Sequence, residues 1–194
     1  MSKLATLAKE ILETCLPQVT ITDADRAVIA THAPFLLGLE DELVTLFYDT
    51  VYGYAPTAAI FEEGERPARE ATLREWWQRT ITSGLDDNYL EWMCLVGIIH
   101  IRRKVQNPMM ISMFQMIANA VHKAALQSLA PEAAEELRVA FSHVAATASA
   151  LIADSYTKSY IGALENLAGL DPKLTARMLA IEVKELEAKA RANT

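Results

Sequence analysis

One histidine in this sequence stands in a setting that could support chemistry. His100 follows the apolar run of residues 95–99, and cations occupy positions 102–104 directly after it. On a helix, Val96 and Gly97 share a face with His100. An imidazole is a common metal ligand, and a glycine one turn earlier would leave room for a flat ligand beside it. The same pattern also fits an ordinary half-buried histidine, with the cations complementing the carboxyl end of the helix.

Other familiar site motifs are missing from the sequence. It contains no His-x-x-x-His or Cys-x-x-Cys pair, no Glu-x-x-His pair of a di-iron bundle, no glycine-rich phosphate loop and no Gly-x-Ser-x-Gly elbow. Cys15 and Cys94 have no metal-spaced partner, which predicts reduced thiols in a cytoplasmic protein. Polynuclear metal, nucleotide and serine-hydrolase chemistry are therefore disfavoured.

The elements that must position His100 are predicted to be helices. Glycine and proline occur only seven times each in 194 residues, too rarely for the many turns of an all-β fold. Thr22 and Asp86 are typical helix caps, and a proline often opens the segment of helical apolar period that follows it. The sequence predicts an all-α fold of seven or eight helices, over residues 2–16, 22–32, 36–53, 67–83, 87–104, 108–129, 131–168 and 172–191, with a loop through Gly64.

Charge and hydropathy exclude two classes of partner. The net charge is −7, and an acidic chain repels the phosphates of nucleic acid. The longest apolar stretch, residues 93–99, is far too short for a membrane span, and the amphipathic start lacks the apolar block of a signal peptide. We therefore expect neither a nucleic-acid nor a membrane partner.

Two short segments resemble a known family when they are taken together. Phe47-Tyr48-Asp49 and the segment 96–102, which reads VGIIHIR, place Tyr48 and His100 52 positions apart on separate predicted helices. This arrangement resembles the sensor globins, which comprise the globin domains of globin-coupled sensors and the single-domain protoglobins. The resemblance implies a globin-like fold with a pre-A segment over 1–20, a haem-binding domain over 21–168 with a long last helix, and a helical tail or linker over 169–194.

The resemblance also implies a cofactor, haem b, and a role for individual residues. His100 would ligate the iron, and Tyr48 would donate to a bound oxygen from the opposite face. Thr72 would be a second distal hydroxyl, and Arg103 would pair with haem propionates. The remaining candidates for haem contact are Leu73, Trp76, Val96, Met110 and Met113.

Structural alternatives stay open for several of these residues. Tyr48 could anchor the core with its hydroxyl at the surface, Thr72 could bond back to its own helix, and Arg103 could lie at a solvated helix end. The sequence also departs from the family at residues 68–71, where a leucine is usual, which leaves the polarity of the distal pocket open.

The implied function is a haem-based gas sensor that is not itself an enzyme. It would bind O₂, with CO and NO as further ligands, and signal through helix repacking to an output domain or protein. The apolar stripe and alanines of helix 131–168 predict a homodimer, because such a surface is unfavourable in water. The alternatives are a haem-free globin-fold interaction module of a signalling complex, and a haem globin with NO dioxygenase or peroxidase-like activity.

Overall fold

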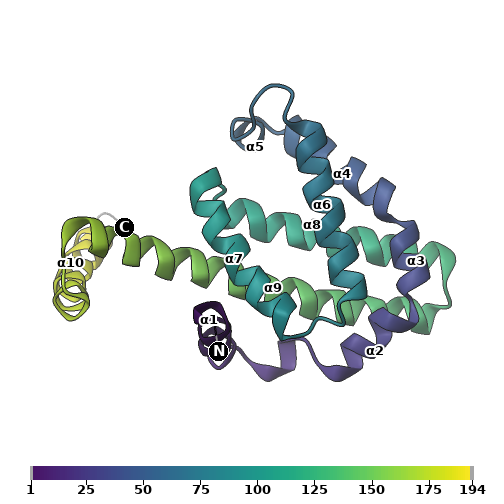
Figure 1. Ribbon diagram of the computed structural model, residues 1–194, viewed down its shortest axis with the longest axis horizontal. Helices are drawn as coiled ribbons and strands as arrows, with labels where there is room; N and C mark the ends of the chain where they lie inside the picture. Colours follow the sequence, from purple (N-terminus) through teal and green to yellow (C-terminus); the bar gives the residue numbers. More distant parts are fainter. Residues whose placement is uncertain (1, 193–194) are drawn as a thin grey trace. The chain divides into compact units, whose positions relative to one another are not determined.

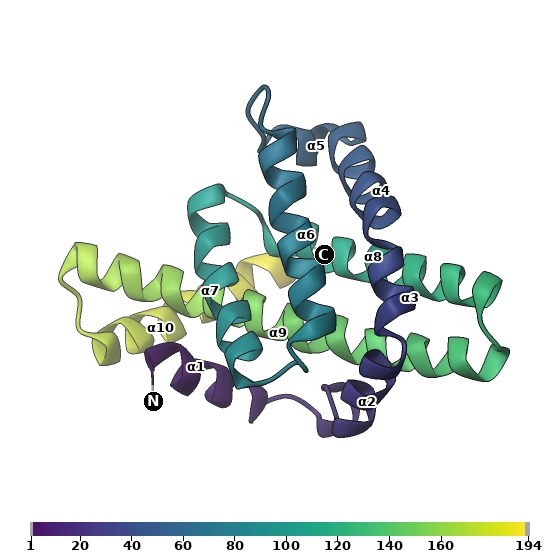
Figure 2. The same ribbon diagram turned by 45° about the vertical axis from the view of Figure 1, so that its right-hand side comes forward.

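The computed structural model describes residues 2–192, and over that range the chain is helical without any strand (Figures 1 and 2). This confirms the predicted all-α class. The elements are α1 Lys3–Leu12, the 3₁₀ turn η1 Pro17–Val19, α2 Asp23–Thr31, α3 Ala33–Gly38, α4 Glu40–Gly53, α5 Ala55–Ala58, α6 Arg66–Thr82, α7 Asp87–Arg103, α8 Asn107–Ser128, α9 Pro131–Ala168 and α10 Pro172–Ala192.

Two short elements depart from the predicted helix boundaries. The single helix expected over 36–53 is instead α3 and α4, which meet at Leu39. Three acids, at residues 40–42, begin α4, and acids in a first turn stabilise a new helix start through the dipole. The expected loop before Gly64 contains the one-turn helix α5. The described chain therefore has more helices than the seven or eight predicted.

By its internal contacts the chain divides into two units, one ending at Tyr156 and the other beginning at Thr157. The first unit holds α1 to α8 and the first part of α9, together with the hydrophobic core. The second unit holds the end of α9 and α10, and α10 has no buried residue over its described length. The domain boundaries expected at residues 20 and 168 stay predictions.

The core of the first unit is built on α8 and α9, which run side by side in both views (Figures 1 and 2). Trp77 of α6 stacks on Phe141 with ring centroids 5.7 Å apart, and its indole N–H donates to the Leu36 carbonyl at 3.0 Å. α1 packs against α7 and buries Ala8 and Ile11. The stripe predicted on α9 is no more than 2% exposed: Leu137, Phe141, Val144, Ala148, Leu151, Ile152 and Ser155.

Gly97 marks a close crossing of α7 and α9. A Cβ atom at this position would lie 2.1 Å from Ser155 Oγ and 2.5 Å from the Ile152 carbonyl oxygen. Such distances are shorter than van der Waals contact, so only glycine fits here. The expectation that Gly97 leaves room for a ligand beside His100 is therefore wrong, because the missing side chain makes room for α9.

Gly97→Ala is expected to destabilise the protein by about 1–3 kcal/mol, because the added methyl group overpacks the crossing against backbone. This loss outweighs the gain of about 1 kcal/mol that alanine brings to a helix interior. Urea denaturation followed by circular dichroism measures the change. Gly162→Ala is the matched control, since a Cβ at that helical glycine meets nothing within 4 Å. Equal effects of the two substitutions would contradict the assignment.

A buried carboxylate fastens the start of α2 to α9. Asp25 is 5% exposed, and its Oδ2 accepts from the Thr22 amide at 2.7 Å, the Thr22 hydroxyl at 2.7 Å and His143 Nδ1 at 2.9 Å. The Thr22 hydroxyl in turn accepts from the Asp25 amide, which completes a capping box and confirms the predicted cap. Burial raises the pKa of Asp25, but the hydrogen bonds from Thr22 and His143 outweigh it and leave the pKa lowered.

Asp25→Asn is expected to lower the free energy of unfolding at neutral pH by about 2 kcal/mol, because it removes a charged acceptor of several hydrogen bonds. The Asp25 carboxyl binds its proton less readily in the folded state than in the unfolded one. Its contribution is therefore complete above the unfolded pKa of 3.8 and is lost as the pH falls through the lowered folded pKa. Denaturation between pH 6 and pH 2 should show a shallower acid loss in the variant. Asp23→Asn, at an exposed carboxylate of the same turn, should leave the acid profile unchanged.

Candidate functional site

A cavity of about 380 Å³ opens among α4, α6, α7 and α8 in the first unit, with further wall residues from α5 and α9. Its wall is mainly apolar, as in pockets that bind small organic ligands or cofactors. Every residue that the sequence predicts for the site lies in this wall, although the contact of each with a cofactor stays a prediction. They are Tyr48 from α4, Thr72, Leu73 and Trp76 from α6, Val96, His100 and Arg103 from α7, and Met110 and Met113 from α8.

His100 presents a neutral imidazole to the cavity. Burial lowers its pKa to about 4, so the ring is uncharged at neutral pH. Its Nδ1 atom is buried and has no hydrogen-bond partner within the described chain. Leaving a buried polar atom without a partner costs free energy, and a ligand bound to the ring would offset that cost. A neutral imidazole is also the form that coordinates a metal ion.

The local sequence of α7 holds His100 in place. The Asp86 carboxylate caps the helix by accepting from the Tyr89 amide at 2.9 Å, as the sequence predicts. At the other end Lys104 adopts a left-handed conformation with φ of 58°, and the Val105 amide donates back to the His100 carbonyl at 3.0 Å. The helix therefore stops one turn after His100.

Tyr48 faces the cavity from α4 with its hydroxyl engaged. Only 5% of the residue is exposed, and the hydroxyl donates to the carbonyl oxygen of Arg69 at 2.7 Å. Its ring packs edge-on against Phe47 and Phe61, with centroids 5.0 and 6.3 Å away. Burial raises the pKa of Tyr48 far above its usual range, so the hydroxyl keeps its proton. The alternative of a core anchor with a surface hydroxyl therefore does not hold, since the hydroxyl lies inside.

The α6 wall combines a polar rim with an aromatic interior. The Thr72 hydroxyl donates to the Ala68 carbonyl at 3.0 Å on an exposed turn, which is the structural alternative considered for this residue. Deeper in the cavity, Trp76 packs edge-on against Phe114 of α8, with centroids 5.6 Å apart. Both hydroxyls have a backbone acceptor, but Thr72 is exposed at the rim whereas Tyr48 is buried, so Tyr48 is the better placed donor of the two.

An ion cluster that sequence reasoning missed contributes two arginines to the cavity wall. Glu65 Oε1 lies 2.6 Å from Arg103 Nη2 and 3.2 Å from Arg69 Nε, and both arginines line the wall. Arg103 is therefore paired with Glu65 rather than solvated. The spacing of Glu65 and Arg69 gives a local hint of a helical ion pair. Nothing in the sequence signals the partner 38 positions further along.

The arrangement suits a cofactor better than a bare metal ion. Among residues 2–192, no group of three or more His, Cys, Asp or Glu side chains could hold a metal. A single neutral imidazole in an apolar wall, with cations at the rim, fits a flat apolar molecule that carries its own metal and acidic groups. A separate finding concerns membranes: no helix in the part of the chain that the structure describes is long and apolar enough to cross one.

Comparison with known families agrees with this reading of the site. The family model described as Protoglobin matches residues 9–161, which is most of the chain and includes every cavity residue. A comparison with curated proteins finds no match. Protoglobins are globins, a class of haem proteins that bind gaseous ligands, and the helical fold described above is the one that such a family implies. From this match and this fold, the chain belongs to the protoglobin family.

Proposed function

We propose that this protein holds haem b in the cavity through His100 and binds O₂ reversibly, with CO and NO as further ligands. One observation carries the proposal: a half-buried, neutral histidine, whose Nδ1 atom has no hydrogen-bond partner in the described chain, opens onto an apolar cavity. When bound, haem would supply a ferrous iron with an open position for a diatomic gas.

The residues of the chain would perform separate tasks around that group. A ring nitrogen of His100 would be the protein ligand to the iron, and Arg103 would pair with a propionate. The Tyr48 hydroxyl would donate a hydrogen bond to the bound gas. This hydrogen bond favours O₂ over CO, because bound O₂ is the more polar of the two. The aromatic and methionine side chains of α6 and α8 would exclude water.

The visible spectrum of the purified protein with one equivalent of haem tests this function. We expect a Soret band that saturates at one haem per chain and shifts on reduction and addition of CO. Weak binding without a defined stoichiometry would instead support the haem-free interaction module. Rapid O₂-dependent consumption of NO in the presence of a reductant would support the alternative dioxygenase activity.

The sensor part of the proposal concerns a second copy of the chain and an output domain or protein. α8 exposes Ile111 and Leu126, which are 48% and 57% exposed. We propose that α8 and α9 of two chains form a four-helix bundle. Gas binding at the haem would change the packing of this bundle and so signal to the output domain or protein. Within the described residues neither Cys15 nor Cys94 takes part in a disulfide, which suits a cytoplasmic site of action.

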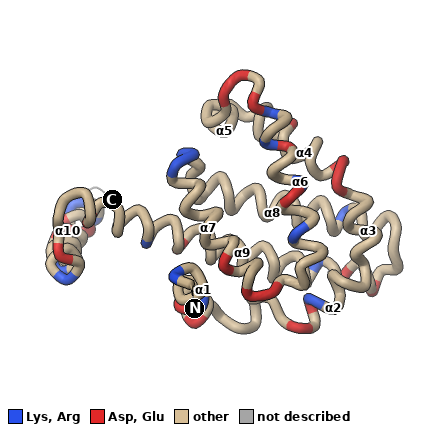
Figure 3. The backbone as a smooth tube through the Cα atoms, in the orientation of Figure 1, with Lys and Arg blue, Asp and Glu red and all other residues tan. Residues whose placement is uncertain are grey.

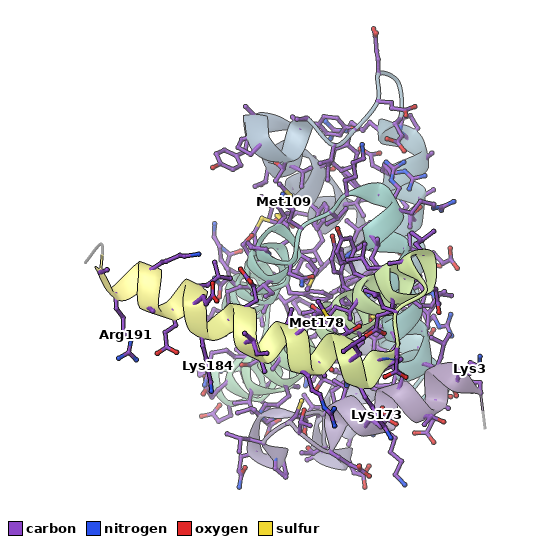
Figure 4. The ribbon with its side chains drawn as sticks, turned by 90° about the vertical axis from the view of Figure 1, so that its left-hand side faces the viewer. Lys3, Met109, Lys173, Met178, Lys184 and Arg191 are labelled. Carbon is purple, nitrogen blue, oxygen red and sulfur yellow. The ribbon has the colours of Figure 1, made fainter. Side chains whose placement is uncertain are left out.

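The helix α10 also supports pairing of two chains. One series of its apolar positions recurs at alternating spacings of three and four, as in a coiled coil, with valine and leucine at successive core positions. Lys173, Lys184 and Arg191 project along one side of the helix (Figure 4). The positions of this series are Ala176, Leu179, Val183, Leu186 and Ala190, and the exposed apolar residues Leu174, Met178 and Ile181 lie outside it.

Light scattering at micromolar concentration is expected to give twice the chain mass of 21.4 kDa. Leu126→Glu should shift the population toward monomer, because it places a charge in the proposed bundle. The matched control is Leu46→Glu, the same change at an exposed leucine of α4, which should leave the dimer intact. A native protein that scatters as a single 21.4 kDa species would contradict the dimer and the signalling route through it.

A further inference from the structure

The proton of the Tyr48 hydroxyl already has an acceptor inside the protein. It is donated to the Arg69 carbonyl at 2.7 Å, on the first turns of α6. A phenol has one proton to donate. A gas in the cavity could therefore accept a hydrogen bond from Tyr48 only in competition with the Arg69 carbonyl.

Glu65 fastens the backbone that carries this carbonyl. Its own carbonyl accepts from the Arg69 amide at 3.2 Å, and its Oε1 pairs with the Arg69 guanidinium. Its Oε2 accepts from the Glu62 amide at 3.1 Å, which closes the turn before α6. The Glu65 side chain is only 14% exposed, so these contacts form in a half-buried setting.

The same carboxylate reaches the helix that carries His100. Arg103 is the last residue of α7, three positions after His100, and its Nη2 lies 2.6 Å from Glu65 Oε1. Figure 3 shows the basic end of α7 and the acidic segment that precedes α6. The hydrogen bond from Arg103 holds the pKa of Glu65 below its usual range, so the carboxylate is charged at neutral pH. Glu65 thereby ties the start of α6 to the end of α7.

We propose that Glu65 is a positioning residue for Tyr48: it holds the Arg69 carbonyl as an acceptor that competes with a bound gas for the Tyr48 hydroxyl. The competition with a gas rests on the proposed haem function, whereas the effect of Glu65 on Tyr48 does not. Without the Glu65 carboxylate, the first turn of α6 loosens and the Arg69 carbonyl becomes a weaker competitor. The hydroxyl is then more available to the ligand.

The first test uses the haem-free protein and the substitution Glu65→Gln. Tyrosine labelled with ¹³C at Cζ reports the hydrogen bonding of each hydroxyl, and the Tyr48 resonance is identified by its loss in Tyr48→Phe. We expect the Tyr48 resonance to shift in Glu65→Gln and to stay in place in Glu63→Gln, which changes an exposed neighbouring carboxylate. An unchanged Tyr48 resonance in a folded Glu65→Gln protein would overturn the proposal. Glu65→Asp, which keeps the charge but shortens its reach, replaces the variant if Glu65→Gln does not fold.

The second test uses the haem-loaded protein and the rate of O₂ release. Because one neutral hydrogen bond is weakened, Glu65→Gln should slow release by roughly three- to tenfold. The effect should vanish when Tyr48→Phe is also present, because Glu65 acts through that hydroxyl. Faster or unchanged release, or an effect that persists without the Tyr48 hydroxyl, would overturn the competition. Absence of haem binding would instead refute the proposed function, and the resonance of Tyr48 would still decide the role of Glu65.

Discussion

His100→Ala is expected to abolish stable haem binding, so that an equimolar mixture with haem shows no protein-specific Soret band. The substitution removes the imidazole that the cavity wall presents, and of the described histidines only His100 lines that wall. The other wall residues are mainly apolar, and the Tyr48 hydroxyl is bonded to the Arg69 carbonyl, so we expect none of them to replace the bond to iron. Haem titration followed at the Soret wavelength measures the loss.

His122→Ala and His143→Ala serve as controls that retain haem. His143 lies on α9 and bonds to Asp25, while His122 lies on α8 outside the cavity wall. His143→Ala should reduce stability, because it leaves the Asp25 carboxylate with one partner fewer. A His100 variant with a full complement of haem and an unchanged spectrum would refute the ligand assignment.

Tyr48→Phe is expected to leave the haem content unchanged and to speed O₂ release. One hydrogen bond to a charged acceptor is worth about 1.5–3 kcal/mol, which corresponds to roughly ten- to a hundredfold in rate. The Arg69 carbonyl competes for the same proton, so the lower part of that range is the expectation. Phenylalanine keeps the ring contacts with Phe47 and Phe61, which is why the pocket should persist. Stopped-flow displacement of O₂ by CO measures the rate.

Thr72→Val is the matched control for the distal donor. Its hydroxyl is bound to the Ala68 carbonyl, so its removal should change O₂ release less than twofold, or by under about 0.4 kcal/mol. An unchanged rate in Tyr48→Phe, together with a large change in Thr72→Val, would identify Thr72 as the principal donor and leave Tyr48 a structural residue.

Features that depend on neighbours in the chain could be predicted from the sequence. The caps at Thr22 and Asp86 formed as expected, because each cap bonds to an amide three residues further along. The helical period also predicted which face of α9 is buried. The predicted helix boundaries were wrong mainly at residues 36–53. The apolar residues there keep a helical period without a break, so the period gave no sign that the acids at 40–42 begin a new helix.

In the candidate site, too, residue type and spacing could be predicted from the sequence, whereas contacts between residues far apart in the chain could not. His100 and Tyr48 could be proposed from residue type, spacing and a family resemblance, and the structure brings both to one cavity wall. The acceptor of the Tyr48 hydroxyl and the carboxylate that pairs with Arg103 could not be predicted, since Arg69 lies 21 positions from Tyr48 and Glu65 lies 38 positions from Arg103.

Gly97 illustrates the physical reason. A period of 3.6 residues tells which side chains share a face, but it does not tell which element covers that face. The sequence pattern put Gly97 beside His100 as space for a ligand, whereas the crossing of α9 at Ser155 fills that space. Likewise, Asp25 and His143 meet across 118 positions of the chain. Contacts of this kind depend on how helices cross, and packing in three dimensions sets those crossings.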